Sequence, residues 1–154
     1  MVHPIATPIT GREDPIDPSD PVGALAEFYR AFNTRDLVLM ERNWASSDEA
    51  SMDNPLGGIK RGWSDIRQVY ERIFGGNVSI TVEFHDYTLH RFGETFLVVG
   101  RERGKSTVGD TTFDLKIRTS RWFHFVDGRW RQLHHHGSIE DADLLARYQA
   151  AVRA

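Results

Sequence analysis

The sequence has no cysteine among its 154 residues, no long apolar run and no excess of basic side chains. The lack of cysteine excludes disulfide bonds, thiolate nucleophiles and zinc sites with sulfur ligands. The longest apolar runs, such as Phe96–Val99, are far shorter than the roughly 20 residues that a membrane-spanning helix needs. Residues 1–14 lack the basic start and apolar stretch of a signal peptide, so we expect a cytoplasmic protein that does not contact a membrane.

The net charge of -3 is concentrated at the N-terminus. Residues 1–20 contain one arginine and four acidic residues, Glu13, Asp14, Asp17 and Asp20, so the remaining residues have a net charge of zero. A neutral body gives no electrostatic reason to expect a nucleic-acid partner. The same segment is rich in proline, which predicts an N-terminal arm over 1–20, either mobile or laid over a neighbouring chain, followed by one domain over 21–154.

Apolar residues recur at helical spacing in four segments of the domain. Asp20 followed by Pro21 is typical of a helix start and predicts a helix over 21–33. Asp36 begins a second, short helix, and Trp63 begins a third that ends at Gly75-Gly76. Ser138 and Asp141 resemble a capping pair before a last helix, in which apolar residues such as Leu144 and Tyr148 share one side.

Alternating residues predict strands between these helices. A short strand covers 51–54, and long ones cover 79–89, 95–104, 112–125 and 129–136, with turns at 91–93 and 127–128. Three helices followed by long antiparallel strands predict an α+β fold, a cone-shaped curled sheet covered by the N-terminal helices. A cone of this size commonly encloses one ligand.

Three stretches of the sequence resemble a known superfamily. Ala31–Leu37 resembles the exit of the first helix of ketosteroid isomerases, and Met52–Gly57 with Asp65–Tyr70 resembles their catalytic strand and third helix. Arg121–Ser138 is similar to the end of SnoaL-like domains and to the association domain of calcium/calmodulin-dependent protein kinase II. The resemblance spans about residues 21–140 and implies the nuclear transport factor 2-like, or cystatin-like, cone with one pocket.

The three catalytic positions of the isomerases hold other residues here. Those enzymes use a carboxylate base, a tyrosine and a protonated aspartic acid. The resemblance places Asn54, Phe28 and Arg121 at these positions, and none of them can perform the same role. Asp53 precedes Asn54 and Tyr29 follows Phe28, so each lies one residue from a catalytic position. One step along a strand, however, turns a side chain to the opposite face. We therefore do not expect steroid isomerisation by that mechanism.

Arg121 is the residue that the resemblance places inside the pocket, with Arg101 (or Arg103) as its counterpart on the preceding strand. A buried guanidinium needs an anion, because leaving it unpaired is expensive. That anion is either a ligand carboxylate, held by two hydrogen bonds, or an internal partner among the acids Asp53, Asp114 and Glu102.

The run His134–His136 alternates between the two faces of its strand. A metal on His134 and His136 would need a third ligand, for which the sequence offers only Asp141 and His124, so we expect no metal and no cofactor.

The turn at Asp127-Gly128 decides which of these residues face the pocket. Two turn residues would place Arg121 opposite His134, and three would place it opposite Leu133. The resemblance favours three, with Arg121, Phe123, Leu133 and His135 inward and Trp122, His124, Trp130, Gln132, His134 and His136 outward. Two tryptophans on the outer face predict a homodimer.

Two kinds of function remain open. One is a binding domain for a small, carboxylate-bearing organic molecule, with ligand contacts from Arg121, Arg101, Asn54, Phe28, Phe123, His135 and Tyr70. The other is an enzyme acting on a small molecule, as a cyclase, isomerase, hydratase or lyase, with His135, Tyr70 or Asp53 as the proton carrier. The loss of all three isomerase groups favours the first.

Overall fold

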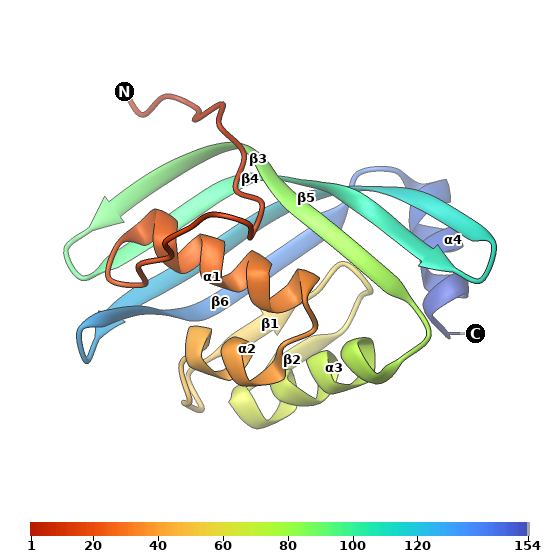
Figure 1. Cartoon of the computed structure of the whole chain (residues 1–154), viewed down its shortest axis with the longest axis horizontal. Coiled ribbons are helices and arrows are strands. Elements are labelled where there is room, and N and C mark those ends of the chain that lie inside the picture. The colour runs from red at the N-terminus through yellow and green to blue at the C-terminus, as the bar shows by residue number, and fades with distance from the viewer. Residues whose placement is uncertain (154) are drawn as a thin grey trace.

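The computed structural model describes residues 1–153 and contains one sheet with helices on its concave side (Figure 1). The helices are α1 (Pro21–Asn33), α2 (Leu37–Asn43), α3 (Trp63–Gly75) and α4 (Ala142–Arg153). The strands are β1 (Ser51–Asp53), β2 (Ile59–Arg61), β3 (Ser79–Phe92), β4 (Thr95–Val108), β5 (Thr111–Val126) and β6 (Arg129–Ile139). No helix in the described part of the chain is long and apolar enough to cross a membrane.

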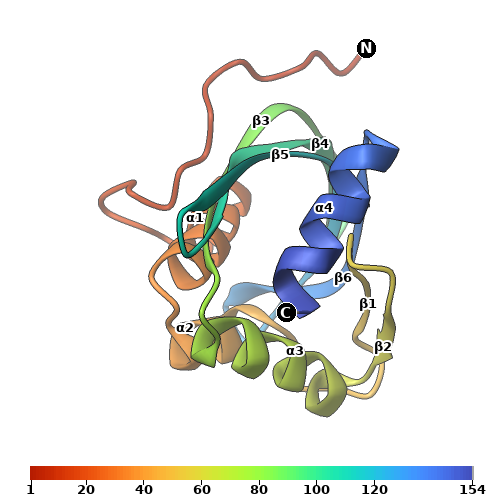
Figure 2. The ribbon, with the colours of Figure 1, turned by 90° about the vertical axis from the view of Figure 1, so that its right-hand side faces the viewer.

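The strand order β2-β1-β6-β5-β4-β3 confirms the α+β class and the curled, unclosed sheet. Neighbouring strands are antiparallel except β1 and β6, which run parallel. Figure 2 shows the sheet bending around an open end, across which α4 lies, while α1, α2 and α3 cover the concave side. The helices therefore pack against the concave side of the sheet, and α4 lies at its open end.

The boundaries of several elements differ from the prediction, and each difference has a local cause. Strand β4 continues through Gly104. The position needs glycine because β3 passes so close that an added Cβ would lie 1.9 Å from the Thr81 carbonyl oxygen. Glycine therefore marks a close approach of two strands and not a strand end. Strand β2, which the sequence pattern does not reveal, pairs with β1. Asp141 alone caps α4, by accepting the Leu144 amide at 2.7 Å, whereas Ser138 belongs to β6.

The predicted three-residue turn before β6 is wrong. Val126 pairs with Arg129, so the turn has two residues, and both Asp127 and Gly128 have the positive φ that tight hairpins require. A register shift between Trp122 and Phe123 then leaves one extra residue in β6, and Arg121 lies opposite His135.

The two-residue turn reverses the predicted facing of the residues nearest to it, and the β-bulge beyond them returns His135 to the inward face. Trp130 and Gln132 are fully buried instead of outward, and Leu133 is partly exposed instead of lining the cone. Arg121, Phe123 and His135 are inward, as predicted. Of the two tryptophans that favoured a homodimer, only Trp122 is exposed, at 45%, so the homodimer stays a prediction with weaker support.

The N-terminal arm lies on its own domain. Ile5 and Ile9 form isolated bridges to β3, the edge strand of the sheet, and Ile9 is buried. Arg30 of α1 donates to the carbonyl oxygen of Gly11, and the Trp130 indole N–H donates to that of Ser19 at 3.1 Å. The arm thus covers part of a strand edge that would otherwise be open to pairing.

The tightest contact of the arm is with α1, and it gives a test of this docking. An alanine Cβ at Gly23 would lie 1.8 Å from the Asp17 carbonyl oxygen. We expect Gly23→Ala to lower the melting temperature by at least about 2–4 °C, the effect of roughly 1 kcal/mol in a domain of this size, although alanine favours the helix itself. Limited proteolysis should then cut within residues 1–20.

The matched control is Gly75→Ala at the end of α3, where nothing lies within 4 Å of the added Cβ. We expect this variant to be as stable as the unchanged protein or more stable. Equal melting temperatures and equal protease resistance for the two variants would contradict the packed arm.

Candidate functional site

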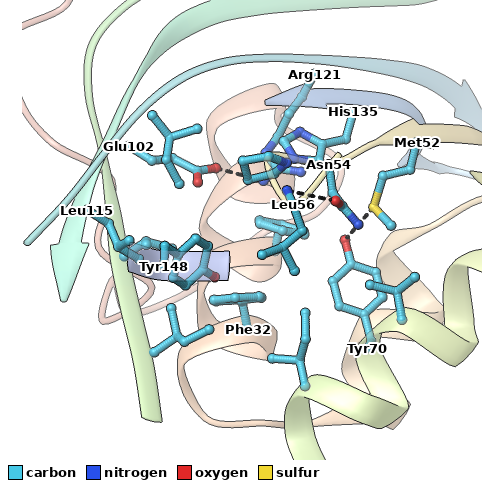
Figure 3. Close-up of a pocket in the computed structure, with 17 residues that line it drawn as sticks. Phe32, Met52, Asn54, Leu56, Tyr70, Glu102, Leu115, Arg121, His135 and Tyr148 are labelled. Carbon is cyan, nitrogen blue, oxygen red and sulfur yellow. Dashed lines mark hydrogen bonds and ion pairs between the residues drawn. The ribbon is translucent and has the colours of Figure 1, made fainter. Parts of the chain in front are cut away.

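A small cavity lies between the concave face of the sheet and the helices α1, α3 and α4. Its volume is about 60 Å³, and most of its lining is apolar, including Phe28, Phe32 and Leu115 (Figure 3). The polar lining residues are Asn54, Tyr70, Glu102, Arg121, His135 and Tyr148. A few polar groups in an apolar concavity are typical of small-molecule sites.

The centre of the polar set is a buried ion pair between Arg121 of β5 and Glu102 of β4. Their side chains are 2% and 7% exposed, and Arg121 Nη2 donates to Glu102 Oε1 at 2.8 Å. The Tyr29 hydroxyl donates to the same carboxylate oxygen at 2.9 Å and accepts from Arg121 Nε at 3.3 Å. The guanidinium carbon lies 3.6 Å from the centre of the Phe28 ring, within the range of a cation–π contact.

Hydrogen bonds extend this pair through the core. Arg121 Nη1 donates to Gln132 Oε1 at 2.7 Å, and Gln132 Nε2 donates to Asn43 Oδ1 at 3.3 Å. Asn43 in turn donates to Glu27 Oε1 at 3.1 Å, and Glu27 forms an ion pair with Arg129. The network explains why Gln132 faces inward: its amide is satisfied on both sides, so it can be buried without a free polar group.

Burial and neighbouring charges determine the protonation of these groups. Burial alone would lower the pKa of Arg121, but Tyr29 and Glu102 raise it, so the guanidinium stays charged. Burial, reinforced by Glu102, raises the pKa of Tyr29 well above its usual value. Burial raises the pKa of Tyr70 to about 12, and its hydroxyl donates weakly to Met52 Sδ at 3.8 Å.

His135 is the one buried histidine of the cavity. Burial, and after it the charge of Arg121, lowers the pKa of His135 well below 6.5, so the ring is neutral at pH 7. Its Nδ1 atom is buried and has no hydrogen-bond partner among the described residues. This nitrogen has no hydrogen bond of ordinary geometry within the described residues, although the backbone of Ser120 beside the ring partly opposes the lowering of the pKa.

The cavity includes five of the residues predicted from the sequence, namely Phe28, Asn54, Tyr70, Arg121 and His135. Phe123 is buried beside them, but its ring stacks on Phe96 at 4.7 Å and does not line the cavity. Arg101 lies on the outer face, where it pairs with Glu140 at 2.6 Å, and so cannot contact a ligand in the cone. Strand alternation places Glu102, and not Arg101, beside Arg121.

Asp53 also lies outside the cavity. On the outer face its carboxylate contacts His136 Nδ1 at 2.5 Å and His134 Nε2 at 3.4 Å, and Ser51 Oγ contacts His134 Nδ1 at 2.8 Å. Because its carboxylate lies on the outer face, Asp53 does not reach a ligand in the cone as the predicted proton carrier would.

Within residues 1–153, no group of three or more acidic, histidine or cysteine side chains is arranged to hold a metal.

Two polar lining residues, Glu102 and Tyr148, were not among the predicted ligand contacts. Glu102 was considered only as a partner of Arg121, although Phe96, Val98 and Glu102 share the inward alternation of β4 and could have identified it. Tyr148 of α4 closes the cavity from the open end of the cone, and Gln149 beside it donates to the Leu56 carbonyl oxygen at 3.0 Å. The apolar side of the last helix was the available signal for Tyr148.

The comparisons with known proteins identify the family. The model of the SnoaL-like domain matches residues 23–142, which is most of the chain, and the protein belongs to this family. No curated protein shows significant similarity to it.

Solved structures support the same superfamily. A candidate dehydratase of the nuclear transport factor 2-like family from Streptomyces avermitilis is 20% identical, with a TM-score of 0.71 over 77% of this chain and 92% of the other. A candidate association domain of calcium/calmodulin-dependent protein kinase II from Thiobacillus denitrificans is 25% identical, with a TM-score of 0.66 over 83% of this chain and 100% of the other. A protein with a cystatin-like fold from Caulobacter vibrioides is 17% identical, with a TM-score of 0.64 over 85% and 94%.

The buried ion pair gives a prediction about stability. Glu102→Ala leaves the Arg121 guanidinium buried without its carboxylate, and we expect it to lower the free energy of unfolding by about 3–5 kcal/mol. Replacing both partners, with Glu102→Leu and Arg121→Met, should recover most of the loss because no unpaired charge remains. Urea denaturation of the purified variants measures both effects.

Asp114→Ala is the control, since it breaks an exposed pair in which Lys105 lies 4.0 Å from Asp114. We expect it to change the free energy of unfolding by less than about 1 kcal/mol. A loss in Glu102→Ala no larger than in this control would show that the pair is not desolvated.

Proposed function

We propose that this protein binds a small organic molecule in the cone and holds an uncharged polar end of that molecule between Arg121 and Glu102. The observation that carries the proposal is the buried pair itself, which offers a hydrogen-bond donor and an acceptor side by side on the wall of an apolar cavity. The aromatic and aliphatic lining, including Phe32 and Leu115, would contact the body of the ligand.

The hydrogen bonds already made by the pair determine which ligand end fits. A guanidinium has five N–H groups, and those of Arg121 that the protein occupies donate to Tyr29, Gln132 and Glu102. Side-chain hydrogen bonds to the Glu102 carboxylate all end on Oε1 in the described structure, so Oε2 can accept from a ligand. A primary amide or an undissociated acid offers the complementary acceptor and donor.

A carboxylate on Arg121, which the sequence suggested, fits this end of the cavity less well. Glu102 already neutralises Arg121, and His135 is neutral, so a second carboxylate would give the buried site a net negative charge. Such a charge in apolar surroundings costs more than it gains from one shared guanidinium.

The cavity must widen to admit such a ligand. Its volume of about 60 Å³ has room for a few waters, whereas small-molecule pockets measure about 300–1,000 Å³. Helix α4 closes the open end of the cone through Tyr148 and Gln149 (Figure 2). We propose that α4 moves outward on binding.

Paired ligands test the charge preference of the site. We expect benzamide to raise the melting temperature more than benzoate does at pH 7, because only the amide complements both Arg121 and Glu102. Glu102→Gln should reverse this order, since it frees the charge of Arg121 for an anion. The measurement is a thermal-shift titration, with circular dichroism to confirm that each variant is folded.

A larger shift with benzoate in the unchanged protein would contradict the neutral site and return Arg121 to the role of a free cation. If benzamide and benzoate shift the melting temperature by the same amounts in the unchanged protein and in Glu102→Gln, Glu102 does not contact the ligand.

A second candidate function, proton-transfer catalysis, is favoured by the unpartnered Nδ1 of His135. A neutral, buried imidazole beside a charged donor such as Arg121 can remove a proton next to a carbonyl group that the donor polarises. Tyr70, with a pKa of about 12, stays protonated and can only donate. One of the similar structures is named as a candidate dehydratase, a reaction that needs such a base.

Hydrogen exchange tests this function without knowledge of the substrate. We expect the protein to accelerate deuterium exchange of the methyl hydrogens of acetophenone in D₂O, followed by NMR, and His135→Gln to reduce the acceleration by about 10²–10⁴-fold. Because the pKa of His135 lies well below 6.5, the rate should be constant above pH 6.5 and fall only at lower pH.

His134→Gln is the matched control, because His134 lies on the outer face and should not affect exchange. Exchange no faster than in buffer would contradict a catalytic role for His135 and leave the binding function as the simpler conclusion.

A further inference from the structure

A second, larger concavity lies at the open end of the cone, and neither proposed function uses it. This mouth groove, of about 770 Å³, is lined by residues of α3, α4, the first residues of β3 and the β1–β2 segment, which surround the same opening in Figure 2. Leu56, Val69, Ile73 and Ile80 line both the groove and the cavity. A molecule that extends from Arg121 toward solvent therefore passes through the groove.

Three basic side chains line the mouth groove, namely Lys60 of β2, Arg72 of α3 and Arg153 at the end of α4, and the first two lie on different elements away from the chain end. Lys60 of β2 pairs in register with Met52, which lines the cavity, so its side chain shares the inward face and is partly buried. Arg72 of α3 lies across the opening and is exposed. No aspartate or glutamate belongs to the described lining of the groove.

Lys60 and Arg72 are not neutralised by the part of the chain that the structure describes. Within residues 1–153, neither Lys60 nor Arg72 forms an ion pair, whereas Arg67, on the same helix as Arg72, pairs with Glu41 at 3.1 Å and with Glu71 at 2.8 Å. The helix thus has one basic residue used in its own surface contacts and another left free over an apolar groove.

We propose that Lys60 and Arg72 bind the anionic end, a carboxylate or a phosphate, of a ligand whose apolar body enters the cone. The inference rests on the proposed function and deepens it: the neutral polar end lies at Arg121 and Glu102, and the anionic end stays in the mouth groove. Charge complementarity supports it, because an anion there meets two uncompensated cations and stays close to solvent. The carboxylate suggested by the sequence is then placed at Lys60 and not at Arg121.

Ligands that carry one or both ends test the inference. The probes are the monoamides of adipate, suberate and sebacate beside hexanamide, octanamide and decanamide, titrated by calorimetry into the full chain. At the chain length that reaches from Arg121 to the mouth groove, we expect the amido acid to bind about tenfold more tightly than the plain amide of the same length. This is the effect of two partly exposed charge contacts. Raising the salt concentration should reduce this advantage. Amidoalkyl phosphates of the same lengths distinguish a phosphate from a carboxylate.

The variant Lys60→Ala with Arg72→Ala should remove most of the advantage of the amido acids, with Arg153 left as the remaining basic residue of the lining, and should leave the binding of plain amides unchanged. The control, Lys105→Ala with Arg118→Ala, removes the same charge from positions outside the groove and should retain the advantage.

Two kinds of result would overturn the inference. The first leaves the proposed function standing, and the second does not. Amido acids and amides that bind equally, or an advantage that is undiminished in Lys60→Ala with Arg72→Ala, would exclude these two residues as the anion site while the cone remains a binding site. An absence of binding by both series would overturn the inference and the proposed function together.

Discussion

The requirement to neutralise one buried arginine organises the interior of this protein. Arg121 of β5 is enclosed by β4, β6 and α1, and each of these three elements supplies groups that satisfy it: Glu102 from β4, Gln132 from β6, and Tyr29 and the ring of Phe28 from α1. Breaking one contact leaves a desolvated charge, so these groups depend on one another more than apolar neighbours do. The same arrangement that satisfies the charge leaves a donor and an acceptor facing the cavity.

In the proposed site a fixed polar wall is combined with a closure by α4 that opens on binding. Arg121 and Glu102 lie on the long strands β5 and β4 and are tied to α1 and α2 by the network through Asn43 and Glu27. The opposite side is closed by α4, whose described contact with the β1–β2 segment includes the single hydrogen bond from Gln149 to Leu56. A rigid recognition surface and a less firmly attached helix suit a pocket that is small when closed and opens to admit a ligand.

The charge of the proposed site changes from the interior of the cone to its opening. The interior pair is neutral, the residues that line both the cavity and the mouth groove are apolar except Asn54, and the basic side chains Lys60 and Arg72 lie where solvent begins. An anion is costly inside and favourable at the rim, so the cost of burying charge would by itself orient an amphiphilic ligand in the proposed site. The SnoaL-like family membership is consistent with such a pocket and does not by itself identify the molecule.

Local patterns in the sequence determined the elements, because helix caps, apolar spacing and turn residues act within a few positions of each other. Asp20, Asp36 and Asp141 each cap the helix that follows, and the inward position of Arg121 follows from strand alternation and the family resemblance. His135 is inward because the bulge in β6 offsets the shorter turn, so that prediction was right although the register behind it was wrong. The bulge at Leu133 could not be predicted, because an extra residue in β6 is stabilised by the buried partners of Trp130 and Gln132 and not by its own neighbours in sequence.

For the same reason, only the tertiary structure decided the partner of Arg121 and the mouth of the cone. The sequence offered Asp53, Asp114 and Glu102 equally. The packing of β4 beside β5 selected Glu102, and the parallel pairing of β1 with β6 placed Asp53 beside the outer histidines. Lys60 and Arg72 are unremarkable in the sequence, and they meet across one groove because β2 and α3 pack at the same opening. Sequence patterns determine which face a residue takes within its own element, but contacts between distant elements depend on strand registry and packing, which no local pattern encodes.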